Sequence, residues 1–251
     1  MFTREELEEY RNVLGFNLWQ VEKDYLQHMF LLFLHQRINR ELIFKGGTAL
    51  QKTFGLNRFS IDLDFTSSNN GIGERIKEVA KDITNFGFPA SLGEVERTET
   101  SKIAKVRIEG PLYDGSERTM TVLRIEISLR DLVLEPMIKE IVPIYSDLRP
   151  YFIVLMDLRE ILAEKARALI WRTDARDLYD LWFLLRKNVK VNVALVDRKL
   201  SYHNLKFDKE EFLGKVNDLR KTWDRELKPI VSALPPFEEV EKDIKETLLA
   251  L

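Results

Sequence analysis

Asp62 and Asp64 are separated by a single leucine in the segment RFSIDLDFT, residues 58–66. Apolar residues alternate with the two aspartates, a pattern that predicts a strand with both carboxylates on one face. Neighbouring carboxylates repel each other unless water or a cation lies between them. Hard oxygen ligands of this kind suit Mg²⁺, with Mn²⁺ as an alternative. An ordinary strand with its polar residues facing solvent gives the same short pattern.

A glycine pair lies upstream of this strand, at the end of the apolar segment ELIF. Gly46 and Gly47 are followed by a short helical pattern, and amides at a helix start form a binding site for phosphate. Lys45 adds a cation and Thr48 adds a hydroxyl donor. A plain strand-to-helix turn is the alternative interpretation. We interpret Lys52 as a solvated surface lysine.

A third carboxylate occurs in a later segment of strand pattern, TMTVLRIEIS, residues 119–128. Alternation places Arg124, Glu126 and Ser128 on the face opposite the apolar residues. Glu126 is the only acid in this segment. Phosphoryl-transfer sites with two metal ions use a further carboxylate from a neighbouring strand, so Glu126 is the candidate for that position.

A second cluster of charged residues lies in AEKARALIWRTDARDLYDL, residues 163–181. Asp174 is a good helix N-cap, and Asp177 and Asp180 share one face of the helix that follows. We expect Arg176 to reach Asp180 and Lys165 to lie on the preceding helix. Residues 159–190 hold eight Lys/Arg and five Asp/Glu, a local basic excess. A salt-bridged pair of packed helices is the alternative.

The composition limits the classes of function. The chain has 251 residues, of which 45% are hydrophobic, enough for one large domain or two smaller ones. The absence of cysteine excludes disulfides and thiol nucleophiles, and three histidines argue against a histidine-rich metal centre. A net charge of -2 excludes a uniformly basic surface for nucleic acid. The start MFTREELEEY is unlike a signal peptide and no apolar run could span a bilayer, so we expect a cytoplasmic protein with no membrane partner.

The elements that must position these residues follow from periodicity. We predict leading helices over 2–40, strands at 41–45, 58–66, 95–99, 104–109 and 119–129, and helices at 48–54 and 73–86. Prolines 136, 143 and 150 mark a change to a helical pattern, with helices at 158–171, 174–186, 209–227 and 237–249. We therefore predict an α+β fold with an α/β domain over 1–150 and an all-helical domain over 151–251. We expect residues 22–24 to pack the leading helices onto the 158–185 segment.

The order of glycine pair, short helix, Asp-x-Asp strand and later single carboxylate resembles the DNA polymerase β-type nucleotidyltransferase superfamily. More closely, FKGGTALQK (44–52) and GLNRFSIDLDF (55–65) resemble the AbiEii/AbiGii family of type IV toxin nucleotidyltransferases, which includes the MenT-like toxins. The resemblance extends to VEKDYLQHMFLL, LREILAEKARALIWRTDARDLYDLWFLL and RELKPIVSALPPFEEV. This chain has Thr48 where the superfamily often has serine, and Glu126 where aspartate is more usual.

The resemblance implies a polymerase β-like mixed sheet with flanking helices, and Mg²⁺-dependent transfer of NMP from an NTP with release of pyrophosphate. It implies that three residues bind the metal: Asp62, Asp64 and Glu126. It implies that the nucleotide is bound by Lys45, Gly46, Gly47, Thr48, Arg58, Lys165 and Arg176. Asp177 resembles the family's essential acid, and we expect it to orient Lys165 in the same site. We also expect Glu126 to help activate the acceptor hydroxyl, so its role as metal ligand or as general base stays open.

The resemblance further implies an RNA acceptor, in particular the tRNA 3′ end, and a cognate antitoxin. Nucleotidylation of a protein or of a small molecule such as an antibiotic uses the same metal centre and stays open. A non-catalytic binding module on the same fold also stays open, although the intact set of three acids argues against a degenerate site.

Overall fold

The structure is a computed structural model that describes residues 2–37, 41–67, 72–129, 133 and 135–250. Its fold is α+β, as predicted. The chain divides into two compact units. The first contains Met1–Gly55 and Phe59–Met156, and the second contains Leu56–Arg58 and Asp157–Leu251. Each unit is described by itself below.

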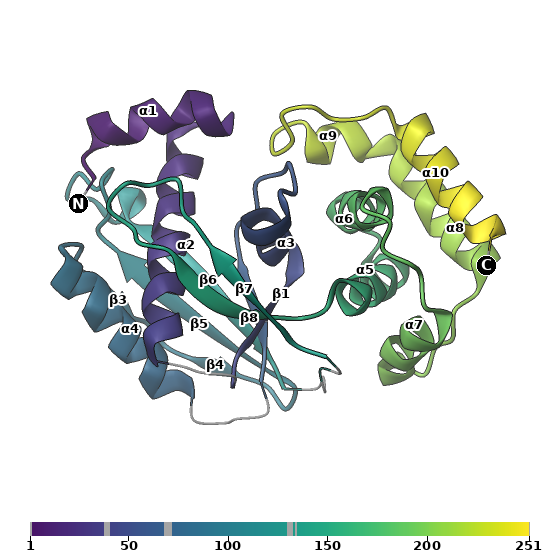
Figure 1. Ribbon diagram of the computed structural model, residues 1–251, viewed down its shortest axis with the longest axis horizontal. Coiled ribbons are helices and arrows are strands. Elements are labelled where there is room, and N and C mark those ends of the chain that lie inside the picture. Colours follow the sequence, from purple (N-terminus) through teal and green to yellow (C-terminus); the bar gives the residue numbers. More distant parts are fainter. Residues whose placement is uncertain (1, 38–40, 68–71, 130–132, 134, 251) are drawn as a thin grey trace. The chain divides into compact units, whose positions relative to one another are not determined.

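The first unit is built on a mixed sheet of eight strands (Figure 1). The strand order is β3-β5-β6-β2-β1-β8-β7, with β4 paired to β5. β2 runs parallel to β6 and β1 runs parallel to β8, whereas the other pairs are antiparallel. The strands are β1 Ile43–Lys45, β2 Leu63–Thr66, β3 Ala90–Leu92, β4 Glu96–Arg97, β5 Ser101–Ile108, β6 Thr121–Ser128, β7 Met137–Ile141 and β8 Tyr151–Leu155.

The described part of this unit contains the α-helices α1 Arg4–Leu14, α2 Leu18–Arg37, α3 Gly46–Phe54 and α4 Ile72–Phe86. Thr3 caps α1 in a capping box with Glu6. The predicted helical span 2–40 contains these first two helices, because Gly15 ends α1 with a left-handed φ of 68° and α2 begins three residues later. Residues 38–40 of that expected span lie outside the described part of the chain.

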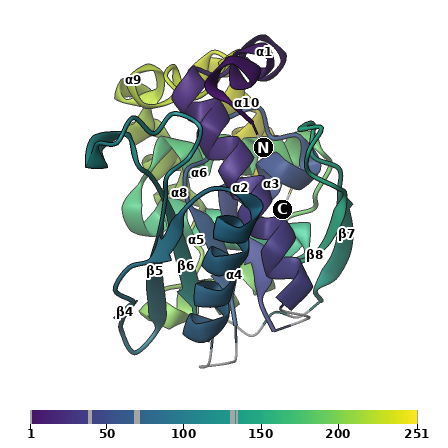
Figure 2. The ribbon, with the colours of Figure 1, turned by 90° about the vertical axis from the view of Figure 1, so that its left-hand side faces the viewer.

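The core of the first unit lies between the sheet and the α2–α4 pair. These two helices lie side by side (Figures 1 and 2). The apolar face of the central strands is closed, since Leu63, Phe65, Ile125 and Ile127 are at most 1% exposed. The polar residues between them therefore project from the other face.

The second unit is helical, with α5 Leu158–Arg172, α6 Ala175–Arg186, α7 Val193–Leu200, α8 Lys209–Asp218, α9 Trp223–Leu227 and α10 Phe237–Leu249. Its start differs from the expected position near residue 150. The segment YFIVL forms β8, which pairs with β1 and β7 and so belongs to the sheet. A five-residue apolar run of this kind is compatible with helix or strand, and only its neighbours decide.

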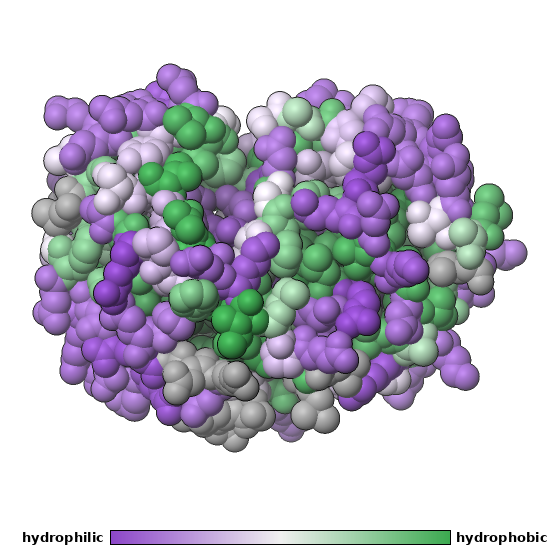
Figure 3. Space-filling model, in the orientation of Figure 1, coloured by the Kyte–Doolittle hydropathy of each residue, from purple (hydrophilic) through white to green (hydrophobic). Residues whose placement is uncertain are grey.

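Hydrophilic side chains cover most of the visible surface of each unit, and apolar side chains form smaller patches between them (Figure 3). This agrees with a composition in which 32% of residues are charged. Among the helices in the described ranges, none combines the length and the apolar composition needed to cross a membrane.

Candidate active site

The carboxylates of the Asp-x-Asp strand lie next to Glu126. In the parallel β2–β6 pair, Asp64 is in register with Glu126, so the two residues are neighbours on one face. Asp62 precedes the first residue of β2, and its side chain is 38% exposed. The strand begins later than the predicted 58–66, and Ile61 lies outside it at 36% exposure. The three acids are thus gathered at two adjacent strands of the first unit.

Gly46 makes room for one of these carboxylates. A Cβ atom at this position would lie 2.3 Å from Oδ2 of Asp64, and its φ of +76° lies in the left-handed region. Lys45 is buried and faces Asp64 across the antiparallel β1–β2 pair. The glycine at the start of α3 therefore lets Asp64 lie directly against the backbone, and a neighbouring lysine supplies a positive charge.

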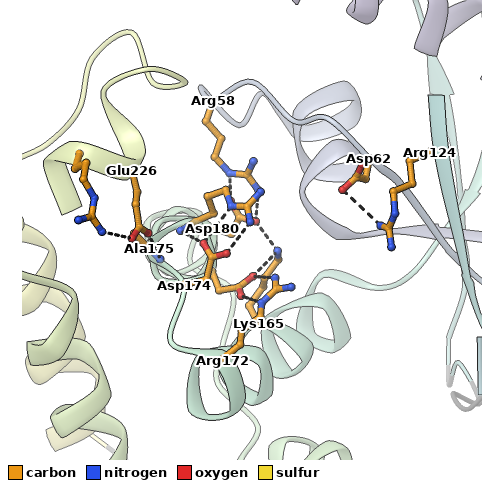
Figure 4. A network of polar contacts seen from close by, with 12 residues as sticks. Arg58, Asp62, Arg124, Lys165, Arg172, Asp174, Ala175, Asp180 and Glu226 are labelled. Atoms are coloured by element: carbon orange, nitrogen blue, oxygen red, sulfur yellow. Dashed lines mark hydrogen bonds and ion pairs between the residues drawn. The ribbon is translucent and has the colours of Figure 1, made fainter. Parts of the chain in front are cut away.

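Arg124 lies among the acids. Its Nη1 is 2.8 Å from Oε2 of Glu126 and 3.6 Å from Oδ2 of Asp62. Figure 4 shows the guanidinium directed at Asp62. Sequence alternation puts Arg124 on the same face as Glu126, but the spacing alone assigns it no partner. One cation thus bridges two of the carboxylates.

The three carboxylates have the ligand chemistry of a divalent-cation site, but their present arrangement does not form one. Asp62, Asp64 and Glu126 offer hard oxygen ligands of the kind that Mg²⁺ takes. Within the described ranges, however, no three His, Asp or Glu side chains converge closely enough to hold a metal ion. The contact with Arg124 occupies Glu126 and Asp62 instead.

Thr48 supports the acid strand. It is fully buried, and its hydroxyl contacts the hydroxyl of Ser60 at 2.8 Å and the carbonyl of Asp62. Gln27 donates from Nε2 to the carbonyls of Ser60 and Ile61 at 3.0 and 2.8 Å. In this structure the Thr48 hydroxyl fixes the backbone that leads into Asp62, and its binding to phosphate stays a prediction.

Lys52 is not a solvated lysine. Its side chain is 1% exposed and forms an ion pair with buried Asp24 on α2. Gln51 and Tyr145 also donate to Asp24, at 3.0 and 2.8 Å. Burial raises the pKa of the Asp24 carboxyl, but the charges of Lys52 and His28 and the hydrogen bonds from Lys52 and Tyr145 together outweigh burial and hold that pKa below its usual value. The pair fastens α3 to α2.

The other α2 residues of this group also have partners inside the first unit. Glu22 accepts from the amide of Leu112 at 2.6 Å and from Thr121, and Lys23 donates to the carbonyl of Val122 at 2.6 Å. Residues 22–24 therefore fasten α2 to the start of β6 and to α3. The expectation that they pack onto segment 158–185 concerns the other unit and stays a prediction.

The second charged cluster lies within the helical unit. Nζ of Lys165 is 3.0 Å from Asp177 and 2.7 Å from Asp180. Arg172 binds Asp177 through two hydrogen bonds of 2.7 and 2.9 Å, and Arg58 binds Asp180 through two of 2.6 and 2.7 Å. Figure 4 shows this chain of alternating charges. Three cations and two carboxylates leave a net charge of about +1.

Two residues expected at the nucleotide have other roles here. Arg58 is 4% exposed and its guanidinium is directed at Asp180. Arg176 does not support Asp180, because it contacts Asp174 at 2.7 Å. Asp174 caps α6 as predicted, accepting from the amide of Arg176 at 2.8 Å. Both arginines therefore stabilise carboxylates of the helical unit.

Burial sets the electrostatics of this cluster. Asp177 and Asp180 are completely buried. Burial raises the pKa of Asp177, but Lys165 and Arg172 outweigh it and hold that pKa well below its ordinary value. Burial likewise lowers the pKa of Lys165, yet the charges of Asp180 and Asp177 raise it overall. Asp177 and Lys165 are thus held in their charged forms at neutral pH.

Comparison with known proteins identifies the family. The model of the AbiEii nucleotidyltransferase toxin family, type IV toxin–antitoxin system, matches residues 30–246. No curated protein sequence matches the chain. Among solved structures, MenT4, a nucleotidyltransferase toxin from Mycobacterium tuberculosis, aligns over 98% of this chain and 88% of its own, with 20% identity and a TM-score of 0.68. JHP933 from Helicobacter pylori aligns over 94% and 92%, with 20% identity and a TM-score of 0.55.

These structures share the fold, and the family match covers most of the sequence together with both charged clusters. Membership implies an NTP substrate and a cognate antitoxin. The chain belongs to the AbiEii family of type IV toxin–antitoxin systems, and it is a nucleotidyltransferase.

Proposed function

We propose that this nucleotidyltransferase moves a nucleoside monophosphate from an NTP to a hydroxyl group of RNA, with the tRNA 3′ end as the preferred acceptor. We further propose that Mg²⁺, or Mn²⁺ in its place, is the cofactor and that the protein acts in the cytoplasm beside its antitoxin. The observation that carries this proposal is the register of Asp64 with Glu126 on adjacent strands, with Asp62 one residue before β2. Membership of a nucleotidyltransferase family supports the interpretation of these three acids as the carboxylates used in nucleotidyl transfer.

In the proposed reaction, the acceptor oxygen forms a bond to the α-phosphorus of the NTP. The bond between the α-phosphorus and the bridging oxygen breaks, and pyrophosphate leaves. Glu126, 40% exposed, takes the proton of the acceptor hydroxyl. Asp62, Asp64 and Glu126 would hold the divalent cation, which when bound offsets the charge that develops on the phosphates.

Other residues have supporting roles in this proposal. The amides at the start of α3, at Gly46 and Gly47, bind the triphosphate because a helix N-terminus attracts anions. Lys165 and Asp177 contribute to transfer, with Asp177 orienting the lysine. Among the described residues, Lys165 forms ion pairs with Asp177 and Asp180. Its ammonium group has three N–H donors, one more than these two partners.

An exposed aromatic stack favours RNA over a small acceptor. Trp171 is 61% exposed at the end of α5. Its ring stacks on His203 at a centroid distance of 4.0 Å and an angle of 16°, and Arg167 contacts His203 at 3.2 Å. Aromatic rings beside cations bind single-stranded nucleic acid by base stacking.

The test is to incubate the protein with each α-labelled NTP, Mg²⁺ and total RNA, and to resolve the products on a gel. We expect label in RNA, and none with Asp62→Asn/Asp64→Asn. Trp171→Ala should weaken labelling at low RNA concentration and leave it nearly normal at saturating RNA. Trp19→Ala, which alters an equally large side chain at 47% exposure in the other unit, is the control.

Label that survives RNase but not protease would identify a protein acceptor, and label in low-mass products would identify a small molecule. Either result would contradict the RNA acceptor and keep the transferase chemistry. Absence of label with every NTP and acceptor fraction would contradict both.

A further inference from the structure

The carboxylate cluster of the first unit already carries its own counter-ions. Asp62, Asp64 and Glu126 contribute three negative charges. Lys45 lies across the β1–β2 pair from Asp64, and Arg124 bridges Asp62 and Glu126. The sheet thus offsets two of these three negative charges with side chains of its own.

The cations differ in how firmly they are held. Lys45 is buried at 8% exposure. Lys23 is buried at 6% and donates to the carbonyl of Val122; burial lowers its pKa, and the Asp62 carboxylate opposes that change. The Arg124 side chain is 35% exposed, and its two carboxylate partners are 38% and 40% exposed. Arg124 is the member of this group that can leave the acids and move into solvent without breaking the core.

We propose that Arg124 is an internal stand-in for the divalent cation: it neutralises Asp62 and Glu126 in the metal-free protein, and the metal must displace it to bind. This inference rests on the proposed metal role of those two acids. It accounts for the arrangement described above, in which suitable donors are present but no three described ligands converge.

The physical reason is competition for the same lone pairs. A carboxylate oxygen that is ion-paired with a guanidinium nitrogen 2.8 Å away is a poorer ligand, and a fixed positive charge beside the site repels a second cation. Removing Arg124 should therefore tighten metal binding and leave the metal-free protein with unbalanced acids. An arginine that merely orients Glu126 for the metal would give the opposite change.

The experiment measures Mn²⁺ binding to the metal-stripped protein without nucleotide, by electron paramagnetic resonance of free Mn²⁺. We expect Arg124→Gln to bind Mn²⁺ about tenfold more tightly than wild type at low salt. In EDTA the variant should melt below wild type, and Mn²⁺ should raise its melting temperature by more than it raises that of wild type.

Lys105→Gln is the matched control. Lys105 is the cross-strand neighbour of Arg124 on β5, and it forms its own ion pair with Glu96 at 2.9 Å. The control removes the same unit of charge from the same region, and its Mn²⁺ affinity should stay within about twofold of wild type. If both variants bind Mn²⁺ more tightly by the same factor, the effect comes from the general loss of positive charge, and the proposal that Arg124 competes with the metal is overturned.

Unchanged or weaker Mn²⁺ binding by Arg124→Gln would also overturn the inference while keeping the metal site, provided that Glu126→Gln weakens binding. Absence of Mn²⁺ binding by wild type and all variants would overturn the metal role itself, and this inference with it.

Discussion

At the scale of single residues, the site depends on close approaches that particular side chains permit. Asp64 can lie against the start of α3 because position 46 has no Cβ atom. Asp177 can stay charged without access to water because Lys165 and Arg172 donate to it. Such contacts tolerate little change in size or charge, so each gives a sharp expectation.

Gly46→Ala should damage the site and the fold together. The added Cβ would collide with Asp64, and the backbone would keep an unfavourable positive φ. We expect a loss of about 2–4 kcal/mol in the free energy of unfolding, measured by urea denaturation. Gly73→Ala is the control, because nothing lies within 4 Å of its Cβ and its φ is not left-handed. It should be neutral or stabilising by up to about 1 kcal/mol, and equal losses in the two variants would contradict the contact.

Asp177→Asn should change how stability depends on pH. The pKa of Asp177 in the folded protein lies below the value of about 3.9 expected for the unfolded chain, so the unfolded chain binds the proton first. The stability from this charge is present above about pH 4 and is lost as pH falls toward the folded pKa. When the free energy of unfolding in urea is plotted against pH between pH 2 and 6, its slope should be shallower in the variant than in wild type, by up to about 1.4 kcal/mol per pH unit. Parallel curves would argue against the shift.

At the scale of elements, the helix pair α5–α6 is fastened by buried charges. Lys165 lies on α5, and its two carboxylates lie one turn apart on α6. A buried pair that loses one partner leaves an uncompensated charge, whereas an exposed pair contributes little. Removing buried Lys165 should therefore cost more stability than removing exposed Arg176.

Lys165→Met should cost about 3 kcal/mol or more in the free energy of unfolding, since it leaves two buried acids that share two arginines. Arg176→Ala should cost less than about 1 kcal/mol, because the side chain is 45% exposed and contacts the partly exposed cap of α6. Chemical denaturation of both variants checks this. If Lys165 acts in transfer, its variant should also lose RNA labelling at temperatures where it remains folded.

Local patterns were sufficient for some elements and not for others. The alternation around Leu63 and Ile125 predicts the two strands that carry the acids, because one face of each is closed by the core. The burial of Lys52 and Arg58 could not be predicted, because their partners lie 28 and 122 residues away. The local sequence around a lysine or arginine is the same whether its side chain is solvated or paired with a buried aspartate. The contact of Arg124 with Glu126 could have been found, since they are two apart on one strand face.

At the scale of the whole molecule, the chain has nearly balanced charges, with 39 Lys and Arg residues and 41 Asp and Glu residues. Mg²⁺ with an NTP should raise the melting temperature of the first unit by mass action, equivalent to about 2.7 kcal/mol at a ligand concentration a hundred times Kd. Asp62→Asn/Asp64→Asn should abolish this increment and leave the ligand-free protein as stable as wild type or slightly more so. Calorimetry with and without ligand checks the expectation, and an undiminished increment in the double variant would refute the metal assignment.

The second unit takes Leu56–Arg58 from the middle of the chain, so the polypeptide passes between the units at three peptide bonds rather than one. A single protease cut after Met156 would therefore not release a complete helical unit. The large N-terminal fragment would retain the arginine that binds Asp180 through two hydrogen bonds. The two fragments of the cut protein should consequently co-elute on gel filtration and separate only in denaturant. A fragment 157–251 produced alone would lack Arg58, the arginine that pairs with Asp180.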